Sequence, residues 1–289
     1  MLGSASAPVL GTPRRRRALR RYRNATIAHA LLIVMVVLTL IPFAWMLDLA
    51  ISPPGALALP DPIPHSITLS YFSQAMQATG VARWVLNSAI YSVVSVAASL
   101  LLCSMAAYAF AKKRFPGNHV IFWSFVSMLM VPWQLTIVPL YLLIANLNGI
   151  DTYWGLILPT VASSQAVFLM RQFILGLPDE LFEAAKLDGA SELVVFRRIV
   201  LPLCVPIMAT LGIFIFLFHW NDFFWPLLAA QSENMQTLTV GLATFQARSP
   251  NVGELMASTI IGFIPSLVVF MLLQRYIVRS IALSGLTGR

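Results

Sequence analysis

The sequence predicts an all-α polytopic membrane protein with six transmembrane helices, and two observations support this fold class. The chain has 289 residues, of which 58% are hydrophobic and 10% are charged, whereas about 25% of the residues in a soluble domain are charged. The apolar residues also gather in long stretches, and a helix needs about 17 to 25 of them to cross a bilayer. A membrane barrel would instead show alternating segments of about ten residues, and this pattern is not found in the sequence.

Six expected spans follow from these stretches. Each should be helical because backbone amides in hydrocarbon must be satisfied within their own segment. The first stretch is too long for a signal peptide and has no small-residue cleavage site, so we expect it to be retained. The expected spans cover residues 26–51, 84–111, 119–145, 153–170, 201–229 and 255–276.

The basic residues predict that both termini are cytoplasmic. They gather in the N-terminal tail, the second and fourth connections and the C-terminal end, and only Arg83 and Arg248 fall in the other connections. The positive-inside rule places the richer connections in the cytoplasm. The net charge of +8 then mostly reflects this topology. We expect the N-terminal arginine run to contact anionic lipid, and nucleic-acid binding by that run is the weaker alternative. The basic positions are Arg14, Arg15, Arg16, Arg17, Arg20, Arg21, Arg23, Lys112, Lys113, Arg114, Arg171, Lys186, Arg197, Arg198, Arg275, Arg279 and Arg289.

The chain divides into a basic N-terminal tail (1–25), expected to be disordered, a six-helix membrane domain (26–280) and a short C-terminal tail (281–289). Two external segments interrupt the spans, 52–83 and 230–254. Five prolines in the first of them predict an irregular cap over its 53–69 portion, because proline removes a backbone donor and fixes φ.

The residues that could support chemistry are sparse. The sequence has no G-x-x-x-x-G-K-[ST] phosphate-binding loop, so any energy from ATP must come from another chain. We expect no cofactor and no metal on this chain, because its four histidines are scattered and form no cluster with cysteine. Cys103 and Cys204 lie at helix ends facing the cytoplasm, where thiols stay reduced.

One cytoplasmic segment, residues 176–202, has an unusual composition for a membrane protein. Pro178 is followed by Asp179 and Glu180 at the start of an apolar-periodic run, which is typical of a helix N-terminus. Gly189 offers a stop, and Ser191 can cap a second short helix over 192–200, ended by the proline at the start of the fifth span. The sequence therefore predicts a helix–turn–helix on the cytoplasmic surface.

This segment has two readings on physical grounds. Ala184 and Ala185 would let another backbone come close, and Glu183 offers a charge to a partner arginine, which suits a knob that docks in a groove of a soluble partner. An ordinary amphipathic loop at the membrane interface is the alternative.

The spacing of the segment resembles the cytoplasmic coupling loop of bacterial ABC importer permeases. The pattern E-A-A, three residues, Gly, nine residues, I-x-L-P is met by every defined position. Three further stretches, at 86–117, 136–159 and 220–227 (WNDFFWPL), resemble the maltose-type carbohydrate-uptake permeases, in particular the shorter six-span partner of their heterodimer. The tail departs from the family's ending after GLT, where the usual small-residue and Lys-Gly finish is missing.

The resemblance implies a type I ABC importer permease fold in the bacterial inner membrane, with no enzymatic activity of its own. It implies a second homologous permease, two copies of a P-loop ATPase that uses ATP and Mg²⁺, an external solute-binding protein and membrane lipid as partners. It also implies ionic contact of Glu183 with the ATPase, close docking at the alanines and a turn at Gly189. The implied coupling residues are Glu183, Ala184, Ala185, Asp188, Gly189, Ile199, Leu201 and Pro202.

The solute and its path stay open at this stage. Polar side chains in lipid are costly and tend to face a cavity or another helix, so the path candidates are Asn87, Gln134, Gln165, Asn221 and Asp222. The resemblance favours a di- or oligosaccharide, and the same machinery importing a polyol phosphate such as glycerol 3-phosphate is the alternative. An ion-driven transporter is the weaker reading, because Asp48 and Asp222 are the only acids near span interiors.

Overall fold

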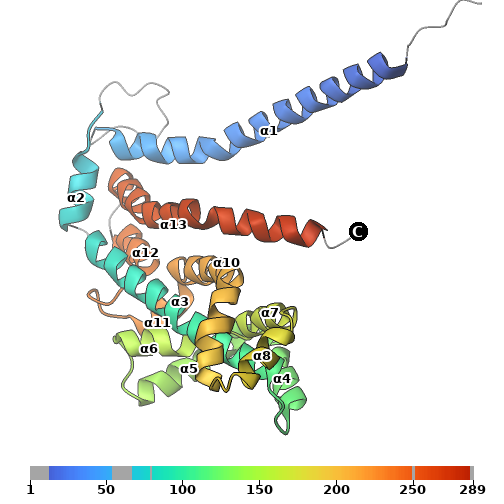
Figure 1. Ribbon diagram of the computed structural model, residues 1–289. Helices are drawn as coiled ribbons and strands as arrows, with labels where there is room; N and C mark the ends of the chain where they lie inside the picture. The colour runs from blue at the N-terminus through green and yellow to red at the C-terminus, as the bar shows by residue number, and fades with distance from the viewer. Residues whose placement is uncertain (1–12, 54–66, 79, 249–250, 287–289) are drawn as a thin grey trace, which may run out of the picture.

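The computed structural model describes residues 13–53, 67–78, 80–248 and 251–286, and every regular element in these ranges is a helix (Figure 1). Four helical stretches are long and apolar enough to cross a membrane, and two bent pairs would raise the number to six if each pair is one span. The elements are α1 (Pro13–Ile51), α2 (Ser70–Ala78), α3 (Val81–Lys112), α4 (Asn118–Ser127), η1 (Met128–Met130), α5 (Trp133–Asn146), α6 (Tyr153–Ile157), η2 (Leu158–Thr160), α7 (Ser164–Leu175), α8 (Glu180–Leu187), α9 (Glu192–Val195), η3 (Phe196–Val200), α10 (Leu201–Trp220), α11 (Phe224–Ala229), α12 (Leu238–Arg248) and α13 (Val252–Leu286).

The third and fourth expected spans are broken rather than continuous. Asn118–Met130 and Trp133–Asn146 meet at 103°, and Tyr153–Thr160 and Ser164–Leu175 meet at 48°. Pro132 stands at the first break and Pro159 lies in η2 just before the second. Proline removes a helical donor and restricts the residue before it, so each break has a local cause in the sequence.

The fifth expected span begins earlier and ends sooner than the sequence predicts. The segment from Glu192 to Trp220 forms one helical stretch, because the π-helical turn η3 joins α9 to α10 without a stop at Pro202. The Leu201 N–H reaches back to the Phe196 carbonyl, and this wider turn carries the helix through Pro202, which has no N–H of its own to donate. At the far end, α10 stops at Trp220 and a separate short helix, α11, follows.

Parts of the expected tail and loops are also helical. α1 begins at Pro13, so the arginine run belongs to a helix; arginine and alanine are good helix formers and proline suits the first turn. The two segments expected to be external contain α2 and α12, and α13 continues to Leu286. The disorder expected for residues 1–12 and most of the irregular cap expected at 53–69 lie outside the described residues.

α3 is the central helix of the fold. It packs along α7 and α10, and its buried face contributes to all three apolar clusters. That face is unusually small and polar for a membrane helix, with Ser88, Ser92, Ser95 and Ser99 fully buried. Small residues let helix backbones approach closely in lipid, where the hydrophobic effect does not drive helices together.

Two side chains of α3 also satisfy the backbone at the second break. The Ser99 hydroxyl donates to the Val161 carbonyl at 2.9 Å, and the Cys103 thiol lies 3.7 Å from the Ser163 carbonyl. The Ser163 hydroxyl in turn accepts from the Ala166 N–H and caps α7. Backbone groups freed inside a membrane must find partners in the protein, and α3 supplies them here.

α1 and α13 lie side by side at the edge of the molecule (Figure 1), with the Phe43 and Phe263 rings 5.6 Å apart. None of the most apolar part of α1 is buried, so this helix presents its surface to lipid or to a partner. The described end of α1 near residue 13 and the C-terminus of α13 point to one side, the side of α8, while α2 and α12 lie on the other (Figure 1).

Gly155 and Gly212 give a matched test of this packing. A Cβ at Gly155 would lie 2.0 Å from the Gly149 carbonyl oxygen, whereas at Gly212 the nearest atom is 3.4 Å away. We expect Gly155→Ala to destabilise the protein by about 1–3 kcal/mol, because α6 must move off a backbone turn, and Gly212→Ala to be tolerated. Thermal unfolding in detergent, followed by size-exclusion chromatography, measures the difference. Equal midpoints for the two variants would contradict the close approach of α6 to residue 149.

Candidate functional site

The segment 176–202 forms the expected helix–turn–helix. α8 starts after Asp179, whose carbonyl accepts the Phe182 and Glu183 N–H groups, and its first turn contains Glu180 and Glu183. Gly189 has a φ of 72°, and the Ala190 N–H returns to the Ala185 carbonyl at 3.0 Å. This is the left-handed stop that favours glycine after a helix, and it turns the chain into α9.

The two faces of α8 divide differently from the sequence prediction. Ala185 is 8% exposed and packs with Phe182 against the cluster formed by the ends of α3, α7 and α10. Glu183, Ala184 and Asp188 are exposed, and Leu187 is 89% exposed. Of the two alanines expected to dock, only Ala184 therefore faces outward, while Ala185 fixes the helix to its own chain.

Two lysines at the end of α3 hold α8 and α9, which together we call the hairpin (residues 180–195). Lys112 Nζ lies 2.6 Å from Asp179 Oδ1 and donates to the Leu177 carbonyl at 3.0 Å. Lys113 Nζ lies 2.5 Å from the Glu192 carboxylate. Each lysine thus binds the acid at the beginning of one of the two short helices, and we call this pair of contacts the lysine tether.

Aromatic side chains support the tether from inside. The Tyr108 hydroxyl donates to Glu192 Oε2 at 2.9 Å, its ring stacks on Phe182 with centroids 6.3 Å apart, and it packs against Phe196. Partial burial lowers the pKa of Lys113, but hydrogen bonds with Glu192 and Tyr108 outweigh it, so the pKa lies above the ordinary lysine value. Lys113 therefore stays charged at neutral pH and the tether persists.

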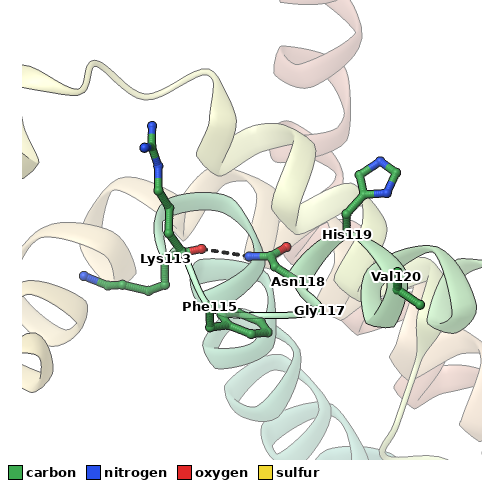
Figure 2. Close-up of a pocket in the computed structure, with 7 residues that line it drawn as sticks. Lys113, Phe115, Gly117, Asn118, His119 and Val120 are labelled. Carbon is green, nitrogen blue, oxygen red and sulfur yellow. Dashed lines mark hydrogen bonds between the residues drawn. The ribbon is translucent and has the colours of Figure 1, made fainter.

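The turn after α3 orients Lys113. Figure 2 shows the Asn118 amide donating to the Lys113 carbonyl, at 2.7 Å, and the Lys113 side chain directed away from His119 and Val120. Gly117 has a φ of 81° and closes this turn. The hydrogen bond between Asn118 and Lys113 joins the start of α4 to the end of α3, so the tether rests on a fixed corner.

The remaining coupling candidates lie beyond α9, in η3 and at the start of α10. Ile199 and Leu201 pack as half-buried side chains against the same cluster that holds Ala185, whereas Pro202 is exposed on α10. Ile199 and Leu201 thus have an internal packing role in this chain. Sequence spacing predicts the segment itself. It does not predict the ion pairs of Lys112 and Lys113, because their partners lie more than 60 residues away in the chain and leave no local pattern.

Of the path candidates, Asn87 is a structural clamp. It is fully buried, its amide donates to the Asn234 and Gln236 carbonyls at 2.9 and 2.8 Å, and its oxygen accepts from the Tyr153 hydroxyl at 2.7 Å. All three contacts join α3 to other elements, and because the side chain is fully buried it presents no polar atom to an open path.

Asp222 is also bound within the chain. The Tyr91 hydroxyl donates to Asp222 Oδ2 at 2.9 Å, and the Thr239 hydroxyl donates to the Asp222 carbonyl at 2.6 Å. The carboxylate stands just before α11, where a negative charge suits the helix dipole. Asn221 is exposed, and its amide donates back to the Leu217 carbonyl at 2.8 Å.

Gln134 and Gln165 differ from these residues. Both are exposed, and neither amide has a hydrogen-bond partner in the described part of the chain. Each lies directly after a helix break, Gln134 at the start of α5 and Gln165 at the start of α7. The five path candidates thus divide into two exposed glutamines without a partner in the described residues and three residues with hydrogen bonds inside the chain.

The structure superposes on one chain of a bacterial ABC transporter involved in the import of the acidic polysaccharide alginate with a TM-score of 0.77, covering 93% of this chain and 99% of that chain at 21% sequence identity. A second structure of a bacterial alginate ABC transporter, in complex with an alginate pentasaccharide-bound periplasmic protein, gives a TM-score of 0.61 at 16% identity, over 89% and 95% of the two chains. The fold is that of an ABC importer permease.

Sequence comparison gives the family. Residues 99–283 match the model of the binding-protein-dependent transport system inner membrane component. The arabinooligosaccharides transport system permease protein AraQ of Halalkalibacterium halodurans is 37% identical over 78% of this chain and 81% of its own length. The sn-glycerol-3-phosphate transport system permease protein UgpE of Yersinia pestis is 38% identical over 68% of this chain and 71% of its own length.

The chain belongs to the family of inner-membrane components of binding-protein-dependent transport systems. It is a transport subunit of the inner membrane and not an enzyme, and the E-A-A spacing at 183–185 is characteristic of the family. The resemblance inferred from the sequence is thereby confirmed.

The tether predicts how the hairpin responds to charge reversal. We expect Lys113→Glu to speed amide hydrogen exchange over residues 179–192 by about tenfold, because two carboxylates would then face each other. Adding Glu192→Lys should restore the wild-type rate. Arg114→Glu is the matched control, since Arg114 is exposed and has no partner in the described chain. Equal exchange in all variants would mean that the ion pair does not hold the hairpin.

Proposed function

We propose that this chain is one of two permease subunits of an ATP-driven, binding-protein-dependent importer of a sugar, and that it couples the translocation path to a separate ATPase. The observation on which the proposal rests is the hairpin 180–195, which exposes Glu183, Ala184 and Asp188 while Ala185 and the lysine tether fix it to α3. A projecting but rigid element is what a force-transmitting contact needs.

In this proposal both termini and the hairpin lie in the cytoplasm, and all six spans cross the inner membrane. The ATPase receives α8 in a groove: Glu183 meets a basic residue, Ala184 allows close approach, and Gly189 keeps the turn narrow. Closure of two ATPase subunits on ATP and Mg²⁺ then moves α8, and α3 moves with it because of the tether.

The proposed solute is a di- or oligosaccharide. The relatives of this chain include an arabinooligosaccharide permease and a glycerol-3-phosphate permease. A polyol phosphate is therefore the competing substrate. Among the spans found, the basic residues Arg83, Lys112, Arg171, Arg197 and Arg198 lie near the ends, which favours an uncharged, hydroxyl-rich solute over a phosphate in the membrane interior.

Gln134 and Gln165 are the residues that we assign to the solute path on this chain. Irregular backbone at membrane depth is tolerated where it lines a cavity or is covered by protein, and each glutamine follows a helix break with its amide unpaired. A second, homologous permease would complete the path, and the exposed apolar surface of α1 suits contact with that subunit or with lipid.

Glu183 tests coupling directly. We expect Glu183→Lys to lower solute uptake at least tenfold, because like charges across a docked interface cost several kcal/mol, while membrane insertion stays normal. Glu183→Asp is the matched control, since it keeps the carboxylate. Uptake and the amount of chain in washed membranes are the two measurements, and unchanged uptake in the lysine variant would refute docking through Glu183.

Gly189 tests the turn independently of charge. With φ at 72° and no atom within 4 Å of a built Cβ, a substitution meets only backbone strain. We expect Gly189→Val to impair uptake and to cost about 1–2 kcal/mol of local stability, and Gly189→Asn, which tolerates this conformation, to retain most activity. If valine and asparagine behave alike, the left-handed turn is not what coupling needs.

Copurification tests the proposed partners. The tagged chain is extracted gently from its native membrane, and whatever accompanies it is identified by mass spectrometry. We expect a second permease, a P-loop ATPase and an external binding protein, and the binding protein can then be titrated with arabinotriose, maltotriose and glycerol 3-phosphate. Recovery of the chain alone, under conditions that preserve a known importer, would contradict the proposal and favour ion-driven transport.

A further inference from the structure

A cup opens on the side of the molecule opposite the hairpin, where the start of α3, the loop before α12 and the end of α12 meet. It has a volume of about 280 Å³ and is lined among others by Arg83, Trp84, Gln236, Thr244, Phe245 and Arg248. None of these residues takes part in the coupling contacts described above. Ligand sites are concave, with apolar walls and a few placed polar groups, and this cup has that composition.

Gln236 is the observation that points to a ligand. The residue is 6% exposed, yet its side-chain amide has no hydrogen-bond partner in the described part of the chain, and it lines the cup. Its backbone is fixed on both sides, because its N–H donates to the Ser232 carbonyl at 3.1 Å and its carbonyl accepts from Asn87 at 2.8 Å. The backbone is thus held in place, while the side-chain amide lines the cup and keeps its donors and its acceptor for a ligand.

The charges of the cup are mostly balanced. Arg248 forms an ion pair with Glu233, whereas Arg83 uses only Nε, which donates to the Asn234 carbonyl at 3.1 Å. Its two terminal nitrogens have no acceptor in the described chain and can donate to a ligand. Because Glu233 is paired with Arg248, Arg83 leaves the cup one positive charge in excess, so the preference for hydroxyl groups rests on its uncharged amide and hydroxyl and not on its net charge.

The walls are apolar and rigid. Trp84 is 8% exposed and packs so closely on α12 that a Cβ at Gly241 would lie 2.1 Å from its ring. Phe245 and the Thr244 hydroxyl come from the same helix, and the hydroxyl has no partner in the described residues. An amide and a hydroxyl can each donate and accept, as neighbouring sugar hydroxyls do.

We propose that this cup binds one hydroxyl-bearing ring of a saccharide at the outer mouth of the importer. Gln236, Thr244 and the terminal nitrogens of Arg83 contact its hydroxyls, and Trp84 and Phe245 cover its C–H surface. The volume admits a single ring, so the cup holds one end of a chain and not a whole oligosaccharide. The inference rests on the proposed function, which makes the solute a saccharide and this side the outer one.

The test uses the assembled importer in nanodiscs, without binding protein and without ATP. Binding of arabinotriose, maltotriose and glycerol 3-phosphate is measured by saturation-transfer difference NMR. We expect Gln236→Leu and Thr244→Val each to weaken binding of at least one trisaccharide about fivefold, since each removes a hydrogen bond to a hydroxyl.

Gln246→Leu is the matched control, because Gln246 is exposed on α12 and does not line the cup. Thr244→Val keeps the side-chain shape, so it reports on binding even if Gln236→Leu fails to assemble.

Each outcome separates this inference from the proposed function. Uptake by the complete importer is measured first, and its absence would refute the proposed function itself. An importer that transports, but whose saccharide binding is the same in wild type, Gln236→Leu and Thr244→Val, would overturn the cup alone. Tighter binding of glycerol 3-phosphate than of either trisaccharide would also overturn it. The proposal would also be overturned if Arg83→Gln weakened docking of the binding protein without changing saccharide binding, because the cup would then be a contact site for that protein.

Discussion

The close approach of α3 to α7 and α10 is the constraint on which the rest of the structure depends. Its buried face carries serines where a soluble core would carry large apolar side chains, and only such small side chains allow this packing in lipid. One of these serines, Ser99, donates to the Val161 carbonyl at the break before α7, so the break and the central helix depend on each other. Larger residues on this face would remove both the contact and the hydrogen bond.

α3 also joins the two ends of the molecule. At one end Lys112 and Lys113 hold α8 and α9, and at the other Asn87 and Ser88 hold the segment before α12, with the Leu238 N–H donating to Ser88 at 2.9 Å. A displacement of the hairpin therefore reaches the far side through one continuous helix, without a chain of loops between them. This continuity agrees with the role of an importer permease, in which events on opposite sides of a membrane must be linked.

Composition and periodicity predicted what depends on local sequence. The all-helical membrane class, the helix–turn–helix at 176–202 and the stop at Gly189 follow from hydropathy, an acidic first turn and a glycine that can adopt positive φ. The breaks at Pro132 and Pro159 were readable in principle, but hydropathy alone runs through them. The division of Ala184 from Ala185, the lysine tether and the clamp at Asn87 could not be predicted, because each depends on partners distant in sequence.

The lysine tether fixes the length of α3. Lys112 is the last residue of α3 and Lys113 follows it in an extended conformation, so the two side chains diverge and reach two different helices rather than one. Inserting or deleting a single residue between Ser99 and Lys112 would rotate both side chains by about 100° and shift them by about 1.5 Å along the axis, while the serine contacts stay in place. Among diverging copies of this protein, point substitutions in the last turns of α3 should therefore accumulate far more readily than changes in its length.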